Sequence, residues 1–236
     1  MIKKILILGM VLQFASCAEL QNVVKNLPNN KELSQEQIGN GLRQALDKGI
    51  QNQVSKLTAQ NGFYKNELVK IVLPKELQDV DKGLRKIGLS NLADEGIKLL
   101  NRAAEDAVKT ATPIFVNAVK NISFEDAKTI LLGEKNEATS YLKAKTTSDL
   151  YAKFNPVIKK SFSKVGANEV WNSLIGKYNS IPFVKKVDTD LTNYVTVEAL
   201  KGVFTMIEVE EKEIREKVDL RTTVLLKQVF ALQDKF

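Results

Sequence analysis

Apolar residues recur at three- and four-residue steps along almost the whole chain after residue 33. The first such run consists of Ile38, Leu42, Leu46, Ile50, Val54 and Leu57. This spacing predicts an amphipathic helix with one buried stripe, because residues three and four apart share a helix face. Ser34 and Gln37 form a capping box at its start, and Asn61-Gly62 ends it.

The same spacing predicts helices in the rest of the chain, each bounded by capping residues, glycines or prolines. They are expected from Pro74 to Gly88, from Ser90 to a break near Thr112, from Pro113 onward, between Ser123 and Gly133, and over residues 137–145, 149–164 (with Pro156 inside), 168–178, 187–194, 197–217 and 220–232. Residues 69–73 are the one stretch that favours a short strand. Residues 181–183 are expected to form a turn.

No Gly- or Pro-rich linker divides this pattern, since the 236 residues include only 12 Gly and 5 Pro. We also find no internal repeat of fixed period. The sequence therefore predicts an all-α fold, with one compact domain over residues 34–236. We expect about nine helices in it and at most one or two short strands.

The N-terminus has the three-part pattern of a secretory signal peptide. Lys3 and Lys4 precede about ten mostly apolar residues, and small residues follow. The apolar run is shorter than the roughly 20 residues that a membrane-spanning helix needs. We therefore expect residues 1–16 to be removed rather than retained as a transmembrane helix.

Cys17, the only cysteine, follows Phe14-Ala15-Ser16, and this string resembles a bacterial lipobox, although Leu is usual where Phe14 stands. Cys17 is accordingly the candidate lipid-attachment residue. The alternative is cleavage after Ala18, which would release a protein without any cysteine. Acyl chains hold a protein on a membrane because each buried methylene contributes about 0.8 kcal/mol.

Residues 17–33 are polar and irregular, which predicts a flexible, lipid-anchored tether between Cys17 and the domain. This places the protein in the bacterial cell envelope, facing the periplasm, with the membrane as its first partner. The net charge of +7 does not make nucleic acid an expected partner behind a signal peptide. Lysines such as Lys159 and Lys160 are interpreted as solvated helix faces.

The absence of histidine excludes the catalytic pairs and metal sites that depend on imidazole. We expect no metal, no cofactor and no catalytic residue. Ser-x-x-Lys strings at Ser140 and Ser161 lack their companion motifs. Asp188-Thr189-Asp190 begins like a calcium loop, but the required glycine and final glutamate are missing.

Carboxylates remain as candidates for glycan hydrolysis, which needs two of them across a cleft. The candidates are Glu105, Asp106, Glu125 and Asp126. Arg102 shares a helix face with Glu105 and Asp106, which indicates a same-helix ion pair or, alternatively, a polar cluster that binds a ligand. The charged residues Glu208, Glu210, Glu211, Lys212, Glu213, Arg215 and Lys217 are interpreted as a solvated helical face, or alternatively as a protein-docking face.

Several strings together resemble one family, the domain of unknown function 4197 of bacterial envelope proteins. They include Asn61-Gly62-Phe63, Lys70 to Pro74, Asn101 to Glu105, Pro113-Ile114-Phe115, Asp126-Ala127, Glu211 with Ile214-Arg215, and Arg221-Thr222-Thr223. The resemblance covers residues 34–230. It implies a secreted or lipid-anchored helical protein and carries over no activity and no site residue.

Three functions remain. The leading hypothesis is a non-enzymatic envelope lipoprotein whose helical domain binds a protein partner or supports an assembly. The second is a carrier or sensor that holds a lipid or another apolar small molecule between helices, at residues the sequence does not identify. The third is a carboxylate-dependent hydrolase of cell-wall glycans. A closed apolar cavity, an exposed apolar patch and a cleft between carboxylates would distinguish them.

Overall fold

The computed structural model describes residues 33–86, 88, 90–164, 167–180, 182, 183, 186 and 190–235. Residues Gln35–Phe236 form one compact unit, the larger of the two into which the chain divides. The signal peptide, Cys17 and nearly all of the tether expected from the sequence lie outside the described residues. So does Ile181, together with Asp188 and Thr189 of the string that resembles a calcium loop.

The described residues confirm the all-α fold, with nine α-helices, three short 3₁₀-helices and no strand among them. The elements are α2 (Gln35–Thr58), η1 (Lys75–Leu77), α3 (Gln78–Lys86), α4 (Ser90–Val108), α5 (Thr112–Lys120), α6 (Phe124–Leu132), α7 (Glu137–Lys164), α8 (Ala167–Asn179), α9 (Thr192–Glu216), η2 (Val218–Leu220), α10 (Val224–Phe230) and η3 (Gln233–Lys235).

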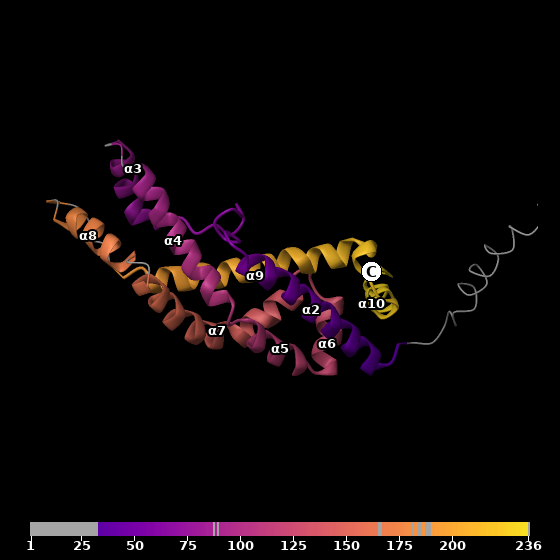
Figure 1. The fold of residues 1–236 in the computed structure, drawn as a ribbon. Helices are drawn as coiled ribbons and strands as arrows, with labels where there is room; N and C mark the ends of the chain where they lie inside the picture. The colour runs from indigo at the N-terminus through magenta and orange to yellow at the C-terminus, as the bar shows by residue number, and fades with distance from the viewer. Residues whose placement is uncertain are drawn as a thin grey trace, which may run out of the picture. The chain divides into compact units, whose positions relative to one another are not determined.

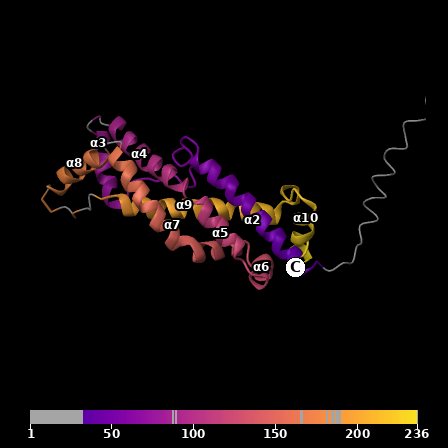
Figure 2. The same cartoon turned by 60° about the horizontal axis from the view of Figure 1, so that its bottom comes forward.

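Helices α7 and α9 pack along each other at the centre of the larger unit (Figure 1). Helix α4 packs on both of them, and α2 packs on α9, α4, α5 and α6. Figures 1 and 2 both place α3 and α8 at one end of this unit and α6 and α10 at the other. The core lies between these layers and includes an edge-to-face pair, Phe115 and Phe204, whose ring centroids are 5.9 Å apart.

The buried residues of α7 explain how one helix contacts so many others. They follow each other at four-residue steps: Leu142, Thr146, Leu150, Phe154, Ile158 and Phe162. Four residues turn about 40° further than one full turn, so the buried stripe winds around the helix axis. Helix α7 thereby presents different sides to α4, α5, α6, α8 and α9.

Two breaks expected from the sequence are wrong. Residues 137–145 and 149–164 form the single helix α7, and residues 192–216 form the single helix α9. Threonines at the expected breaks donate their hydroxyl groups to carbonyl oxygens four residues earlier, Thr146 to Leu142 and Thr196 to Thr192, both at 2.7 Å. This hydrogen bond lets threonine remain inside a helix, so an interruption of the apolar spacing at a threonine does not end the helix.

The helix expected over 220–232 is shorter than the sequence predicts. The 3₁₀-helix η2 ends at Leu220, and α10 begins only at Val224. Thr223 caps α10, since its hydroxyl oxygen accepts a hydrogen bond from the backbone N–H of Leu226 at 3.2 Å. The cap at position 223 sets a new helix start that the apolar spacing alone does not mark.

Other expected boundaries are confirmed. Ser123 caps α6 by accepting from the backbone N–H of Asp126 at 3.0 Å, and Pro113 stands in the first turn of α5. Gly88 has a φ of 83°, the left-handed conformation that follows many helix ends. Pro156 lies inside α7, where it deprives the carbonyl of Ala152 of its helical donor. Ala152 is exposed, so water can take that donor's place.

Candidate interaction surface

The segment between α2 and η1 runs along one side of α9. The side-chain amide of Asn66 lies 3.5 Å from the sulfur of Met206, and the hydroxyl of Tyr194 donates to the carbonyl oxygen of Val72 at 2.8 Å. Twelve residues of helix separate these two contacts, a rise of about 18 Å. Residues 66–70 form a turn, in which the backbone N–H groups of Val69 and Lys70 donate to the carbonyl oxygen of Asn66 at 3.1 and 2.8 Å. The segment follows α9 between the two contacts, which are made at their ends by the side chains of Asn66 and Tyr194.

Residues 69–73 do not form the short strand that the sequence favours, although they keep its alternation. Val69, Ile71 and Leu73 are buried, while Val72 is exposed. The place of a neighbouring strand is taken by one side chain, the amide of Asn101. It accepts from the backbone N–H of Ile71 at 2.8 Å and donates to the carbonyl of Ile71 at 2.7 Å. Both backbone groups are satisfied without a second strand.

Phe63 and Val69 hold this segment against α9 at Gly202. A Cβ atom at position 202 would lie 2.7 Å from Cε1 of Phe63 and 3.2 Å from Cβ of Val69. The backbone of α9 and the segment approach closely only because glycine stands there. The segment is thus fixed to α9 by packing as well as by hydrogen bonds.

Gly202→Ala is expected to destabilise the domain by about 1–3 kcal/mol, because the added methyl group overpacks this contact. The matched control is Gly176→Ala in α8, where nothing lies within 4 Å of an added Cβ. That change should be neutral or stabilise by up to about 1 kcal/mol. Urea unfolding of both variants measures the difference, and equal midpoints would contradict the close packing at Gly202.

The outer side of this contact exposes large apolar side chains. Leu68 is 65 % exposed, Val72 is 50 % exposed and Val197 on α9 is 48 % exposed. Tyr194 stands one turn before Val197 and is tied to Val72 by its hydroxyl. We call Leu68, Val72, Tyr194 and Val197 the α9 surface. Large exposed apolar side chains make this part of the domain the candidate interaction surface.

A buried carboxylate and a buried guanidinium on α9 hold the ends of two other helices. Glu211 accepts from the backbone N–H groups of Ala138 at 2.9 Å and Thr139 at 2.8 Å, in the first turn of α7. Arg215 donates to the carbonyl oxygens of Ile130 at 2.7 Å and Leu131 at 3.0 Å, in the last turn of α6. Each charge thus meets the helix end whose dipole it complements. We call Glu211 and Arg215 the α9 clamp.

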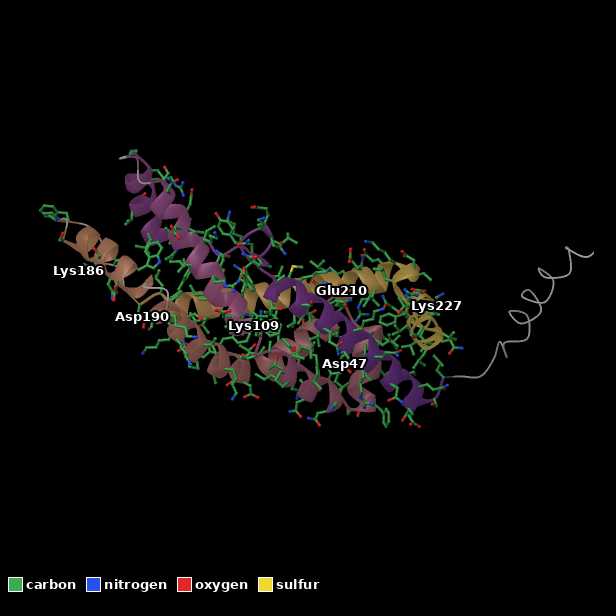
Figure 3. All side chains as sticks on the ribbon, in the orientation of Figure 1. Asp47, Lys109, Lys186, Asp190, Glu210 and Lys227 are labelled. Carbon is green, nitrogen blue, oxygen red and sulfur yellow. The ribbon has the colours of Figure 1, made fainter. Side chains whose placement is uncertain are left out.

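The clamp corrects the interpretation of residues 208–217 as a solvated face. Glu211 and Arg215 are buried and bonded to each other, with Nη2 2.8 Å from Oε1. The neighbouring pairs Glu208–Lys212 and Glu213–Lys217 are partly or largely exposed. Glu210 lies where α9 passes α2 and accepts from Gln53 (Figure 3).

Arg221 ties down the end of α9 in the same manner. Its side chain is buried, and it donates to the carbonyl oxygens of Ile214 at 3.1 Å and Arg215 at 2.8 Å. The guanidinium also pairs with Asp234 and stacks 5.4 Å from the ring centroid of Phe230. Hydrogen bonding to Arg221 holds the pKa of the Asp234 carboxyl below its usual range. These contacts fasten the C-terminal residues to α9.

Three hollows are lined by described residues. The largest, about 430 Å³, lies between the first turns of α2 and α6, beside the half-exposed ring of Phe124. A second, about 220 Å³, lies between α5 and α7, where burial, followed by the nearby Asp126, raises the pKa of Tyr141. The third, about 200 Å³, lies between α4 and the turn after α2 and includes Glu105. All three are open to solvent.

The candidate catalytic carboxylates are not brought together. Glu105 borders the third hollow, whereas Glu125 borders the largest one. Asp106 is bonded to Lys109 at 2.7 Å and to the hydroxyl of Ser161 at 3.2 Å. Asp126 stands in the first turn of α6. Within the part of the chain that the structure describes, no group of three or more metal-ligating side chains occurs.

No helix among the described residues is long and apolar enough to cross a membrane.

The profile of one family, described as Protein of unknown function (DUF4197), matches residues 32–231. No curated protein and no solved structure matches the chain. The strings that carried the sequence resemblance contain Asn101, the α9 clamp and Arg221, all of which hold the fold together.

Proposed function

Because the chain belongs to the family described as Protein of unknown function (DUF4197), a description that assigns no activity, we propose its function from the geometry of its own residues. We propose that it is a non-enzymatic lipoprotein of the bacterial envelope. Cys17 holds it on the membrane, and the helical domain docks a protein partner on the α9 surface from the periplasmic side. The observation that carries this proposal is the exposure of the large apolar side chains Leu68, Val72 and Val197.

The chemistry of the α9 surface suits a protein ligand. Tyr194 belongs to a residue type that is enriched among those dominating binding energies at protein interfaces, and Leu68, Val72 and Val197 add exposed apolar area. Lys70 lies over the ring of Tyr64, 4.7 Å from its centroid, and Lys201 follows Val197 by one turn of α9. A partner that presents apolar side chains beside a carboxylate would complement this arrangement.

The buried charged residues support a role without catalysis. The side chains of the α9 clamp and of Arg221 form hydrogen bonds with backbone groups at helix ends, and the chain contains no histidine. The carrier hypothesis calls for an enclosed apolar cavity. The hollows that the described residues line are open and bordered by amide or charged side chains. We therefore favour docking over transport of an apolar molecule.

The membrane anchor is tested by Cys17→Ser. Loss of the thiol removes the site of acylation, and with it the methylenes that bind the bilayer. We expect the variant to move from the membrane fraction to the soluble envelope fraction and to lose labelling by fatty acids. Retention of Cys17→Ser on membranes, together with an unlabelled wild-type protein, would rule the anchor out.

The docking surface is tested by photocrosslinking in intact cells. A photoreactive residue is placed at Val72, at Val197 or at the control position Val224, which is 66 % exposed on α10. We expect one and the same protein to be crosslinked from positions 72 and 197, and none from position 224. Crosslinks only to lipid, or the same products from all three positions, would overturn the proposal.

A further inference from the structure

The hollow beside α4 combines a buried acid with exposed cations. It measures about 200 Å³, and the residues that matter here are Gln60, Asn61, Glu95, Lys98, Arg102 and Glu105. Four of these come from α4 at steps of three and four residues, so they share one face of that helix. Asn61, with a φ of 65°, turns the chain after α2 over the same place.

Glu105 is the most buried residue of this hollow, with 1 % of its surface exposed. Its carboxylate accepts from the backbone N–H of Phe63 at 3.3 Å and from Nη1 of Arg102 at 3.2 Å. Bonds from a charged donor to a carboxylate are ordinarily about 2.7–2.9 Å long. A carboxylate can accept about four hydrogen bonds. Glu105 therefore has both the capacity and the position to receive a further donor.

Arg102 stands beside this acid with most of its donors unused. Its side chain is 49 % exposed, and among the described residues the contact with Glu105 is its one hydrogen bond. A guanidinium offers five N–H donors in a fixed fork that fits a carboxylate. Lys98, one turn earlier on α4, adds a second cation to the same rim.

We propose that this hollow binds a small zwitterion, a molecule that carries a free ammonium group and a carboxylate, such as an amino acid or a short peptide. The ammonium group donates to Glu105, and the ligand carboxylate accepts from Arg102 and Lys98. The volume lies below the roughly 300–1,000 Å³ of pockets for drug-sized ligands, which limits the ligand to this size class.

The paired charges explain why a zwitterion fits better than a simple ion. An anion alone would place its charge near the buried carboxylate of Glu105, and a cation alone would face Arg102. Only a ligand with both groups, one bond or a few bonds apart, complements both side chains at once. A ligand that lacks one group contacts only one of the two charged side chains, so we expect it to bind about 10-fold or more weakly than a zwitterion.

Titration calorimetry and NMR of the folded full-length chain test this site with alanine and alanyl-alanine, each in the L and D forms. N-acetylalanine lacks the ammonium group, and alanine amide lacks the carboxylate. We expect at least one zwitterion to bind and to shift the amide resonance of Phe63, and both blocked ligands to bind at least 10-fold more weakly. Tighter binding of alanine would point to a free amino acid as the ligand, and tighter binding of alanyl-alanine would point to a peptide terminus.

Two variants assign the contacts. Glu105→Gln keeps an acceptor for Phe63 and should weaken zwitterion binding at least 10-fold. Arg102→Gln keeps an amide donor that can bond the Glu105 carboxylate, and its unfolding midpoint is measured to check its fold; it should weaken binding of the same ligand by a similar factor. Glu125→Gln, at the largest hollow, is the matched control and should bind as the wild type does. If no zwitterion binds at 20-fold or higher molar excess, or if Arg102→Gln binds it unchanged, the proposal is wrong.

Discussion

Arg215→Met is expected to lower the free energy of unfolding by about 3–5 kcal/mol, because it leaves a buried carboxylate without its counter-charge. Glu211 would keep its contacts to the first turn of α7 but lose both bonds from the guanidinium. The carbonyl oxygens of Ile130 and Leu131 would lose their donors as well. Since a domain is stable by only about 5–15 kcal/mol, this loss removes a large share of the total.

The control for this prediction lies at the C-terminal end of the same helix, where Lys217 is the residue that follows α9. Glu213 and Lys217 have the same spacing and order as Glu211 and Arg215, and their ion pair is 2.8 Å long, but about half of each side chain is exposed. Lys217→Met should therefore leave the unfolding midpoint nearly unchanged, because solvent screens an exposed ion pair. Urea unfolding measures both variants. Equal effects of the two substitutions would show that the α9 clamp does not depend on burial.

Asn101→Ala is expected to destabilise the domain by about 2–4 kcal/mol. The substitution leaves the buried N–H and C=O groups of Ile71 without partners, and each unsatisfied group costs about 1–3 kcal/mol. Residues 69–73 should loosen with it, so the amide of Ile71 should exchange its hydrogen faster. Hydrogen exchange and urea unfolding report these two effects separately.

Asn117→Ala is the matched control for Asn101→Ala. Asn117 lies on the exposed side of α5, where alanine is the better helix former. This change should be neutral or slightly stabilising. If Asn101→Ala unfolds at the same urea concentration as Asn117→Ala, the account of Ile71 is incorrect.

The helices could be predicted from the sequence because their boundaries carry local chemistry. Ser123 is a cap, Gly88 is a stop and Pro113 begins a helix, and each acts within a few residues. The missed continuity of α7 and α9 also has a local cause, the hydroxyl bonds of Thr146 and Thr196. A pattern of apolar spacing treats these threonines as gaps, although their side chains support the helix.

The polar contacts across the fold could not be predicted, because sequence spacing does not show what lies opposite a residue. Glu211–Arg215 and Glu213–Lys217 are indistinguishable as i, i+4 pairs, yet only the first is buried against α6 and α7. Asn101 likewise reads as one more polar residue of an amphipathic helix. Its role depends on Ile71, which lies 30 residues away in the chain.

The α9 surface depends on the same kind of long-range placement. Leu68 and Val72 come from the segment between α2 and Pro74, where the sequence favours only a short strand over residues 69–73. Val197 comes from α9, where the sequence indicates an ordinary helix position. The contacts that place residues 66–72 along α9, Asn66 with Met206 and Val72 with Tyr194, join residues more than 100 positions apart in the chain.

The most direct test of the docking function is the yield of the protein crosslink from position 197 when both Leu68 and Val72 are changed to Ser. These side chains are half or more exposed, so the substitutions should leave the unfolding midpoint nearly unchanged. We predict that the crosslink yield falls at least fivefold relative to the otherwise unaltered chain. An unchanged yield from a normally folded double variant would contradict the proposal that the α9 surface docks the partner.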